Sequence, residues 1–252
     1  MAKGVYGCID GVSRNVPQIP LCVDLVSRNT KAGYACVDGV SRKFFGGASL
    51  EVGDTVYIDS ALFNEEFMVI HKGLPSSAYD SSCDGIWVMY KFPYENYAWT
   101  KGYSSDVYSD ASTIHEYLNN TVLNKFSTNI RNLIKQVTIP CYKGDVSAKL
   151  FLLSYMEVLG TTDTYYNISE GAVLDYFNGA TASDRRGWTN ETKVSANAWW
   201  LRTPRGLSNS AFRIQNDGEV GTLSKTSNGA SYRFAMILPH DVQVDSNFNI
   251  IA

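Results

Sequence analysis

Five cysteines are the side chains of this 252-residue sequence that most readily suggest metal or redox chemistry. They stand at positions 8, 22, 36, 83 and 141, and the first three are each 14 residues apart. The 13-residue gaps between those three contain no histidine, which does not match the spacing of zinc ligands. An odd number of cysteines, in a chain with no export signal, also argues against a disulfide framework. We therefore interpret Cys8, Cys22 and Cys36 as small buried residues that fill the same position of three repeats.

The three histidines do not form a recognisable catalytic pattern. His71, His115 and His240 are far apart in the sequence, and no Ser-His-Asp order, HExxH motif or phosphate-binding loop accompanies them. The stretch "QND" at 215–217 is reminiscent of a lectin calcium motif, but Gly218 follows it and no set of acidic ligands converges there, which favours a turn. The sequence therefore predicts a protein that is not an enzyme and that uses no metal or other cofactor.

Composition excludes two classes of partner. The net charge is −3, and the Lys and Arg residues are scattered, so we expect no nucleic-acid partner. No apolar run reaches the roughly 18 residues of a membrane span, and the N-terminal "MAKGVYGCIDG" has no signal-peptide core. With 44% apolar residues the chain can form a globular core, and we expect synthesis in the bacterial cytoplasm without secretory export.

A short phrase is repeated three times near the N-terminus. The 14-residue step that relates the cysteines also relates Asp10, Asp24 and Asp38. Asp-Gly between two short runs of β character predicts a hairpin in the first and third copies, whereas Leu25 replaces the glycine in the middle copy and should distort its turn. Three hairpins cannot bury much apolar area, so we predict that residues 1–47 are an assembly module completed by neighbouring chains, most plausibly in a homotrimer.

Residues 48–252 are expected to form one α+β domain. Strand-like runs occupy 54–59, 65–73 and 85–92, and helices are expected to begin at Thr113, with a Glu116 capping box, and at Ser127. Residues 149–160 are interpreted as a buried strand leading into a turn, and 169–180 as a short helix with Ser169 as N-cap. The last sixty residues return to strands, with a hairpin at Asp217-Gly218.

Several longer stretches carry a resemblance that spans nearly all of residues 51–245. They look like a family of uncharacterised proteins from gut Firmicutes and their prophages, which resembles the C-type-lectin-like fold of the variable proteins of diversity-generating retroelements, including the phage major tropism determinant. The N-terminal repeat resembles the "YVGVDGVARK" repeats attached to phage tail and baseplate proteins. The matching stretches are "FMVIHKGLPSSAYDSSCDGIWVMYKF", "HEYLNNTVLNKFSTNIRNLIKQVTIP", "LFLLSYMEVLG", "LDYFNG", "WWLRTP" and "FAMILP".

The resemblance implies a variable ligand-binding face between two buried anchors, 199–201 and 236–238. The intervening segment is rich in Ser, Asn, Thr, Gly and Arg, which is the composition of a paratope but also of an ordinary polar hairpin. We expect at least one of the rings of Trp199 and Trp200 to point into the core. Alternation places Phe212 on the side of Ile214, so the core is the alternative position for this one member of the set. The side chains expected to face solvent on one surface are Arg205, Asn209, Phe212, Arg213, Asn216, Glu219, Thr222, Ser224, Lys225, Asn228 and Tyr232.

One departure from the resembled family concerns the last strand. The chain reads "SYRFAM" where that family usually has "GIRPAL", so Phe234 stands in place of a proline. The formylglycine-generating oxidases share the general fold class but act through cysteines near the C-terminus, and this chain has none after Cys141.

Together these features predict a phage or prophage surface protein, located on the virion tail or surface. It would bind a host-cell receptor, protein or glycan, through residues 205–232 and other virion proteins through residues 1–47. A virion decoration protein without a specific ligand is the alternative, and a cell-wall-acting enzyme is a third. Dispersal of the eleven side chains over several faces would favour the decoration protein.

Overall fold

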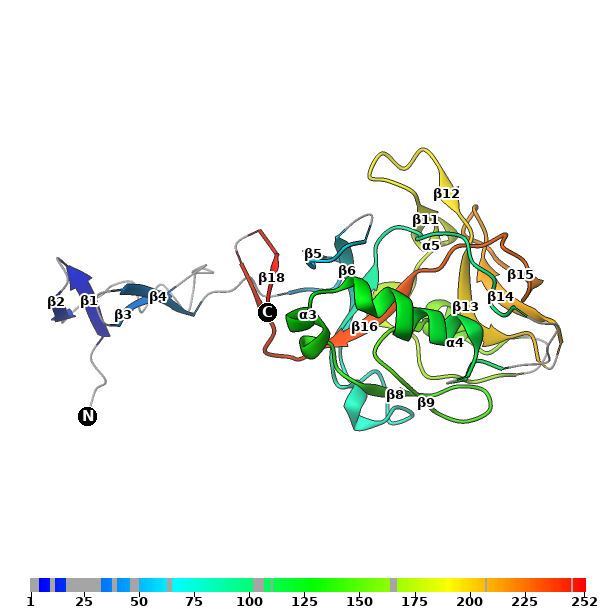
Figure 1. Ribbon diagram of the computed structural model, residues 1–252, viewed down its shortest axis with the longest axis horizontal. Helices are drawn as coiled ribbons and strands as arrows, with labels where there is room; N and C mark the ends of the chain where they lie inside the picture. The colour runs from blue at the N-terminus through cyan, green and yellow to red at the C-terminus, as the bar shows by residue number, and fades with distance from the viewer. Residues whose placement is uncertain are drawn as a thin grey trace. The chain divides into compact units, whose positions relative to one another are not determined.

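The computed structural model divides the chain into two compact units, residues 1–49 with 243–251, and residues 50–242 with the last residue (Figure 1). Before residue 50 it describes only the backbone of four strands, residues 5–9, 12–16, 33–37 and 40–45. Beyond that point it describes residues 50–62, 65–101, 107–109, 111–163, 167–206, 208–245 and 247–252. Each unit is described by itself below.

The first and third N-terminal repeats are β-hairpins, as the sequence predicts. β1 (Val5–Ile9) pairs with β2 (Val12–Val16), and β3 (Gly33–Val37) with β4 (Val40–Phe45), both antiparallel. Ile9 lies opposite Val12 and Val37 opposite Val40, so the paired strands of each hairpin are two residues apart in the sequence. The middle repeat with Cys22 and Leu25, the side chains of Cys8 and Cys36, and the Gly46-Gly47 step lie outside the described residues. A further small pair, β17 (Gln243–Val244) and β18 (Ile250–Ile251), belongs to the same unit.

A five-stranded antiparallel sheet forms the core of the larger unit. Its strand order is β10-β16-β7-β6-β5, and the strands pair antiparallel throughout. Every residue of β7 and β16 is buried, because both strands are continuous apolar runs covered on both faces. The bounds are β5 (Thr55–Tyr57), β6 (Glu66–Gly73), β7 (Gly85–Tyr90), β10 (Phe151–Leu152) and β16 (Phe234–Leu238), with a 3-10 turn, η1 (Ser81–Cys83), before β7.

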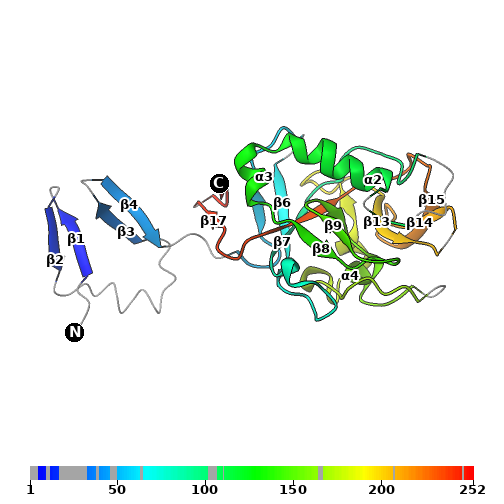
Figure 2. The same ribbon diagram turned by 60° about the horizontal axis from the view of Figure 1, so that its bottom comes forward.

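A helical stretch lies alongside this sheet in both ribbon views (Figures 1 and 2). It runs from α2 (Thr113–Glu116) through a π-helical segment, η2 (Tyr117–Val122), and a 3-10 turn, η3 (Leu123–Lys125), to α3 (Thr128–Leu133). Ser127 caps α3 as expected. The capping box expected at Thr113 is wrong, because Ser112 is the N-cap residue of α2 and its side chain makes no capping hydrogen bond.

Asn119 explains why this stretch leaves the regular helix. Its amide oxygen accepts hydrogen bonds from the backbone N–H groups of Lys149 and Leu150, and its amide nitrogen donates to the carbonyls of Leu150 and His115. Such a side chain inserted between helix and neighbouring backbone accommodates the wider π-helical turn. The apolar residues Ile114, Leu118 and Val122 still share the buried side.

Two expectations for the middle of the chain are corrected. Residues 149–160 are a helix rather than a long strand: after the two-residue β10, α4 (Tyr155–Leu159) begins at a capping box of Ser154 and Glu157 and ends at left-handed Gly160. Residues 169–180 contain only a 3-10 turn, η4 (Asp175–Phe177). Gly171 has φ +103°, and the Tyr79 hydroxyl would lie 2.0 Å from a Cβ at this position, so no helix passes through it.

The remaining strands build a second, three-stranded antiparallel sheet of order β13-β14-β15. These are β13 (Trp199–Pro204), β14 (Ser210–Ile214) and β15 (Val220–Ser224), where the sequence predicts strands. The smaller elements are β8 (Val137–Ile139) with β9 (Val146–Ala148), β11 (Gly187–Trp188) with β12 (Ala196–Asn197), and α5 (Ala182–Arg185). The described fold is thus mixed α+β, with small antiparallel sheets and short helices. None of the described helices is both long and apolar enough to cross a membrane.

The anchors on either side of the predicted face are buried. Both Trp199 and Trp200 are fully enclosed, so the expectation of at least one core ring is confirmed. Their indole N–H groups donate to the carbonyls of Arg185 and Tyr97 at 3.0 and 2.8 Å. Phe234, which stands in place of the family's proline, is the first residue of β16 and stacks on Tyr90 with ring centroids 5.2 Å apart.

Candidate functional site

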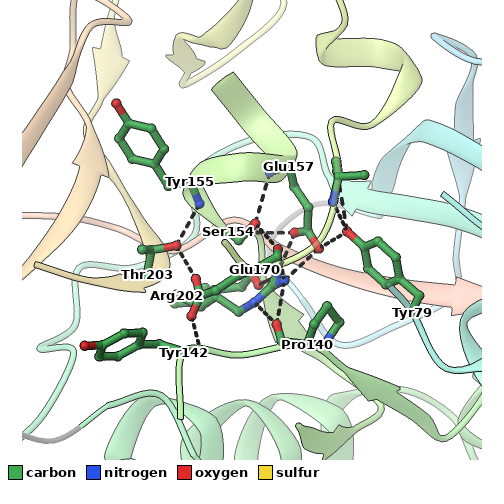
Figure 3. Close-up of polar contacts among 11 residues, drawn as sticks. Tyr79, Pro140, Tyr142, Ser154, Tyr155, Glu157, Glu170, Arg202 and Thr203 are labelled. Carbon is green, nitrogen blue, oxygen red and sulfur yellow. Dashed lines mark hydrogen bonds and ion pairs between the residues drawn. The ribbon is translucent and has the colours of Figure 1, made fainter. Parts of the chain in front are cut away.

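A buried network of charged side chains fixes the strand that carries the candidate face. Arg202 of β13 forms a two-pronged ion pair with Glu157 of α4, with N–O distances of 2.6 and 2.7 Å (Figure 3). The same guanidinium donates to the backbone carbonyls of Pro140, Leu152 and Glu170. Arg202 and Glu157 are both fully buried. The charge of Arg202 is therefore neutralised and hydrogen-bonded inside the core, as a buried charge requires.

A second carboxylate, Glu170, completes the network. It accepts hydrogen bonds from the Tyr142 backbone N–H at 2.7 Å and from the Thr203 hydroxyl, whose oxygen in turn accepts the backbone N–H of Tyr155 (Figure 3). The Ser154 hydroxyl donates to the Glu170 carbonyl, and so ties the N-cap of α4 to this segment. Through these contacts α4 and residues 140–142 and 170 all hold β13.

Burial and the paired charges shift the pKa values of the network in opposite directions. Burial raises the pKa of Glu170, although Arg202 counteracts the shift. Burial alone would lower the pKa of Arg202, but attraction to Glu157 outweighs it and holds the pKa above its usual value. Burial and the nearby Glu157 raise the pKa of Tyr79, whose hydroxyl donates to Glu157 at 2.9 Å. Since the charged groups are sealed from solvent, the network positions β13 rather than meeting a reactant.

The register of the three-stranded sheet decides which way each candidate side chain points. Phe212 lies opposite Thr222 and Ser210 opposite Ser224, so Phe212, Thr222 and Ser224 share one face of the hairpin. Arg213 lies opposite Gly221 on the other face. The strand residues of the predicted set are therefore divided between two faces, and the expectation of one common surface is wrong for them.

Three members of the predicted set are buried, in contrast to the expectation. Phe212 packs edge-on against Tyr155, with ring centroids 4.9 Å apart, and faces the same side as Ile214. Lys225 places its ammonium 5.1 Å from the centre of the Trp99 ring. Tyr232 donates its hydroxyl to Glu95 at 3.0 Å. Aromatic packing, cation–π attraction and a buried hydrogen bond respectively remove these side chains from solvent.

The other eight members retain contact with solvent. Asn216, Glu219 and Asn228 are exposed, and Arg205, Asn209, Arg213, Thr222 and Ser224 are half-buried. Asn216 and Glu219 lie together in the turn between β14 and β15. Asn209 donates to the Ser224 hydroxyl at 3.4 Å, and Arg213 donates to the Gly229 carbonyl at 3.1 Å, which brings the 225–230 loop beside the hairpin.

Two of these side chains keep a polar atom without a hydrogen-bond partner among the described residues. The atoms are the amide oxygen of Asn209 and Nε of Arg213, and both are sealed from solvent. Unsatisfied buried polar atoms are rare in folded proteins because each costs about 1–3 kcal/mol.

The turn of the hairpin is held rigidly by the segment before β11. The Nε atoms of Arg185 and Arg186 donate to the carbonyls of Gly218 and Asp217 at 3.2 and 3.0 Å. Gly218 has φ +87°, and a Cβ at this position would lie 1.7 Å from the carbonyl oxygen of Ala182. The Asp-Gly turn is thus confirmed, and the glycine is required by both its conformation and its surroundings.

A cavity joins the C-terminal loop to residues that the sequence did not single out. It has a volume of about 360 Å³ and is lined by Asn228 and Thr226 on one side and by Asn96, Tyr97, Ala98, Thr100 and Lys101 on the other. The stretch "NYAWTK" at 96–101 is rich in aromatic and hydrogen-bonding residues, and this composition is the signal that could have identified it. Amide, hydroxyl and aromatic groups in one cavity suit a polar organic ligand.

Two cysteines and two histidines of the larger unit are buried, whereas His240 is exposed and lies 2.8 Å from the Asp84 carboxylate. Cys83 and Cys141 are buried free thiols; burial raises the pKa of Cys83 to about 11 and that of Cys141 further. His71 and His115 are buried as well. Within the described part of the chain, no three His, Cys, Asp or Glu side chains are grouped as metal ligands.

Residues 79–240, well over half of the chain, match the family described as "Domain of unknown function (DUF6273)", so the chain belongs to this family. No curated protein and no solved structure matches the chain.

Proposed function

We propose that the chain is a phage or prophage surface protein that binds a host receptor through the solvent-facing part of residues 205–232. The observation that carries the proposal is the contrast between two strands of one sheet: every residue of β13 is buried, whereas every residue of β15 is half-buried. A partly open strand in the same sheet as a buried one, with β14 between them, is suited to presenting contacts without loss of stability. The unsatisfied atoms of Asn209 and Arg213 supply two groups that a ligand could engage after a rotamer change.

The proposed contact surface is smaller than the sequence alone suggests. Phe212, Lys225 and Tyr232 are buried and are left out of it, and the ligand meets the exposed Asn216, Glu219 and Asn228 and their half-buried neighbours. The C-type-lectin-like fold is part of this proposal, since it is inferred from the resemblance of residues 51–245. The proposed trimerisation through residues 1–47 would hold several such surfaces together, which raises avidity by roughly 10² to 10⁴ when geometry permits.

The binding test replaces the three exposed side chains with alanine in one variant, Asn216→Ala/Glu219→Ala/Asn228→Ala. A matched control removes the same residue types elsewhere on the unit, at the exposed Asn120, Asn129 and Glu65. Fluorescently labelled protein is measured on intact cells of the bacterium that carries the gene. We expect the first variant to lose binding and the control to retain it. Both should unfold close to the wild type, because exposed substitutions usually change stability by less than about 0.5 kcal/mol. Equal binding by both variants would contradict the proposal.

A virion decoration protein without a specific ligand is the second candidate. The division of Arg213 from Thr222 and Ser224 between two faces of the hairpin favours it, because a single flat epitope cannot use all three. The neighbouring genes discriminate between the two candidates. A reverse transcriptase, a template repeat and adenine-rich codons over residues 205–232 support a diversified binding face, whereas their absence supports decoration. The assembly module is tested separately by light scattering of the full chain, where a monomer at micromolar concentration would contradict it.

A further inference from the structure

Arg233 is a buried arginine without the counter-ion that Arg202 possesses. It lies directly before β16 with 4% of its surface exposed. Its Nε and Nη2 atoms donate to the carbonyls of Tyr90 and Lys91 at 3.3 and 2.7 Å, and the guanidinium lies 5.2 Å from the centre of the Trp199 ring. Among the residues that the structure describes, Arg233 forms no ion pair with a carboxylate, and its side-chain hydrogen bonds are made by Nε and Nη2.

The charge of Arg233 is costly in this position. Burial lowers its pKa to about 10, so the guanidinium remains protonated at neutral pH. A buried charge is normally paired, because removing it from water without compensation is unfavourable. The two carbonyls and the Trp199 ring compensate only in part, since none of them carries a full negative charge.

Arg233 lines a cavity of about 310 Å³ with a positively charged wall. Lys91, Arg186 and Lys193 also line it, against two acids, Asp184 and Glu191. Both acids already have partners: Glu191 and Glu66 bind Lys91, and Asp184 accepts hydrogen bonds from the backbone and hydroxyl of Thr181. Four cations and two acids line the cavity, which leaves an excess of two positive charges, and Glu66, which also binds Lys91, reduces this excess to one.

Arg186 is held in a position suited to a ligand. Its guanidinium lies over the Trp188 ring, 5.2 Å from the centre, and its Nε donates to the Asp217 carbonyl at 3.0 Å. These contacts fix the side chain and use only one of its five N–H donors. A guanidinium with fixed orientation and unused donors matches the geometry of an oxyanion.

We propose that this cavity binds the oxyanion group of a ligand, a phosphate, sulfate or carboxylate, with Arg233 as the buried contact and Arg186 and Lys193 at the rim. The bound group supplies the negative charge that the protein does not provide for Arg233. The site adjoins the 205–232 surface, because Arg186 also donates to the Asp217 carbonyl, but it does not depend on the proposed receptor binding. A free anion and a phosphodiester of a polymer offer the same chemistry, and the probes below separate them.

The test titrates the full chain with inorganic phosphate, sulfate, acetate and dimethyl phosphate at constant ionic strength, chloride being the balancing ion. Binding is followed by the NMR signals of the arginine Nε–H groups. We expect phosphate or sulfate to move the Arg233 and Arg186 signals with saturation. Dimethyl phosphate reports on a polymer backbone, and acetate on a carboxylate.

Two rim variants keep the test independent of folding. Arg186→Gln and Lys193→Gln each remove one charge from a half-buried or exposed side chain. Each should weaken binding of the preferred anion about tenfold, the effect of losing one charge-assisted hydrogen bond. The control Lys143→Gln removes an exposed lysine outside the cavity and should leave the affinity unchanged. Absence of saturable shifts with every probe, or equal weakening by the control, would overturn the assignment.

A third variant addresses the buried charge directly. Arg233→Gln should abolish the anion-dependent rise in unfolding temperature that the wild type shows, because stabilisation by a ligand requires binding to the folded state. If Arg233→Gln were as strongly stabilised by the preferred anion as the wild type, Arg233 would not be the contact. Whether Arg233→Gln keeps or loses the stabilisation by the anion, the result does not bear on the proposed receptor binding.

Discussion

Replacing Arg202 with methionine should be among the most damaging single changes in the larger unit. Methionine approximates the aliphatic stem of arginine but removes both bonds to Glu157 and those to the carbonyls of Pro140, Leu152 and Glu170. Glu157 and Glu170 are then left buried without a cation. Removing one partner of a buried ion pair typically costs about 3–5 kcal/mol. Because three carbonyls also lose their hydrogen bonds, we expect the cost of Arg202→Met to lie toward the upper end of this range.

The assays are urea unfolding and thermal unfolding, each followed by circular dichroism and tryptophan fluorescence. A loss of about 3–5 kcal/mol should lower the unfolding temperature by roughly 6–20 °C in a unit of this size. The control Arg131→Met removes a half-buried arginine that bonds only the side chains of Asn124 and Thr128, and it should cost less than about 0.5 kcal/mol. A loss below about 1 kcal/mol for Arg202→Met would refute the claim that this network holds β13.

Two further predictions concern single residues of the same unit. Gly218→Ala should destabilise the unit by more than the roughly 1 kcal/mol of left-handed strain, because the new Cβ also meets the Ala182 carbonyl; urea unfolding checks this, and an unchanged midpoint contradicts it. Glu170 binds its proton more tightly in the folded than in the unfolded chain, since its pKa is raised. Its contribution to stability is therefore complete below about pH 4.5 and is lost as the pH rises through the raised pKa. Glu170→Gln should thus gain stability relative to the wild type as the pH rises above about 4.5, and a pH-independent difference would contradict the assignment.

Local patterns predict much of the fold but not its buried charges. β6, β7, β13 and β16 follow from continuous apolar and β-branched runs, and the Asp-Gly hairpins from their turn residues. The helix α4 was predictable in principle, because Ser154 and Glu157 have capping-box spacing. By contrast, Arg202 is indistinguishable in sequence from a surface arginine, since the partner that permits its burial lies 45 residues earlier.

On the candidate face, too, local patterns predict some features, whereas others depend on contacts with distant segments. Phe212 is expected to face solvent but is buried, although alternation along β14 offers the core as the alternative for this residue. The burial of Lys225 and Tyr232 depends on Trp99 and Glu95, which lie on a distant segment, and no local period contains that information. The charge excess around Arg233 likewise arises where residues 91, 186, 193 and 233 converge on one cavity.

The close approach of Gly218 to Ala182 also limits how the protein can change over evolutionary time. The turn at 215–219 touches the backbone at Ala182, so it cannot lengthen without displacing α5. In the next loop, Asn228 and Gly229 are exposed, and a Cβ at Gly229 would meet only side chains. Insertions and deletions among relatives should therefore accumulate between residues 226 and 229, while the tip of the hairpin keeps its length. A library designed to give the protein a new specificity would accordingly vary loop length at Asn228 and only side-chain identity at Asn216 and Glu219.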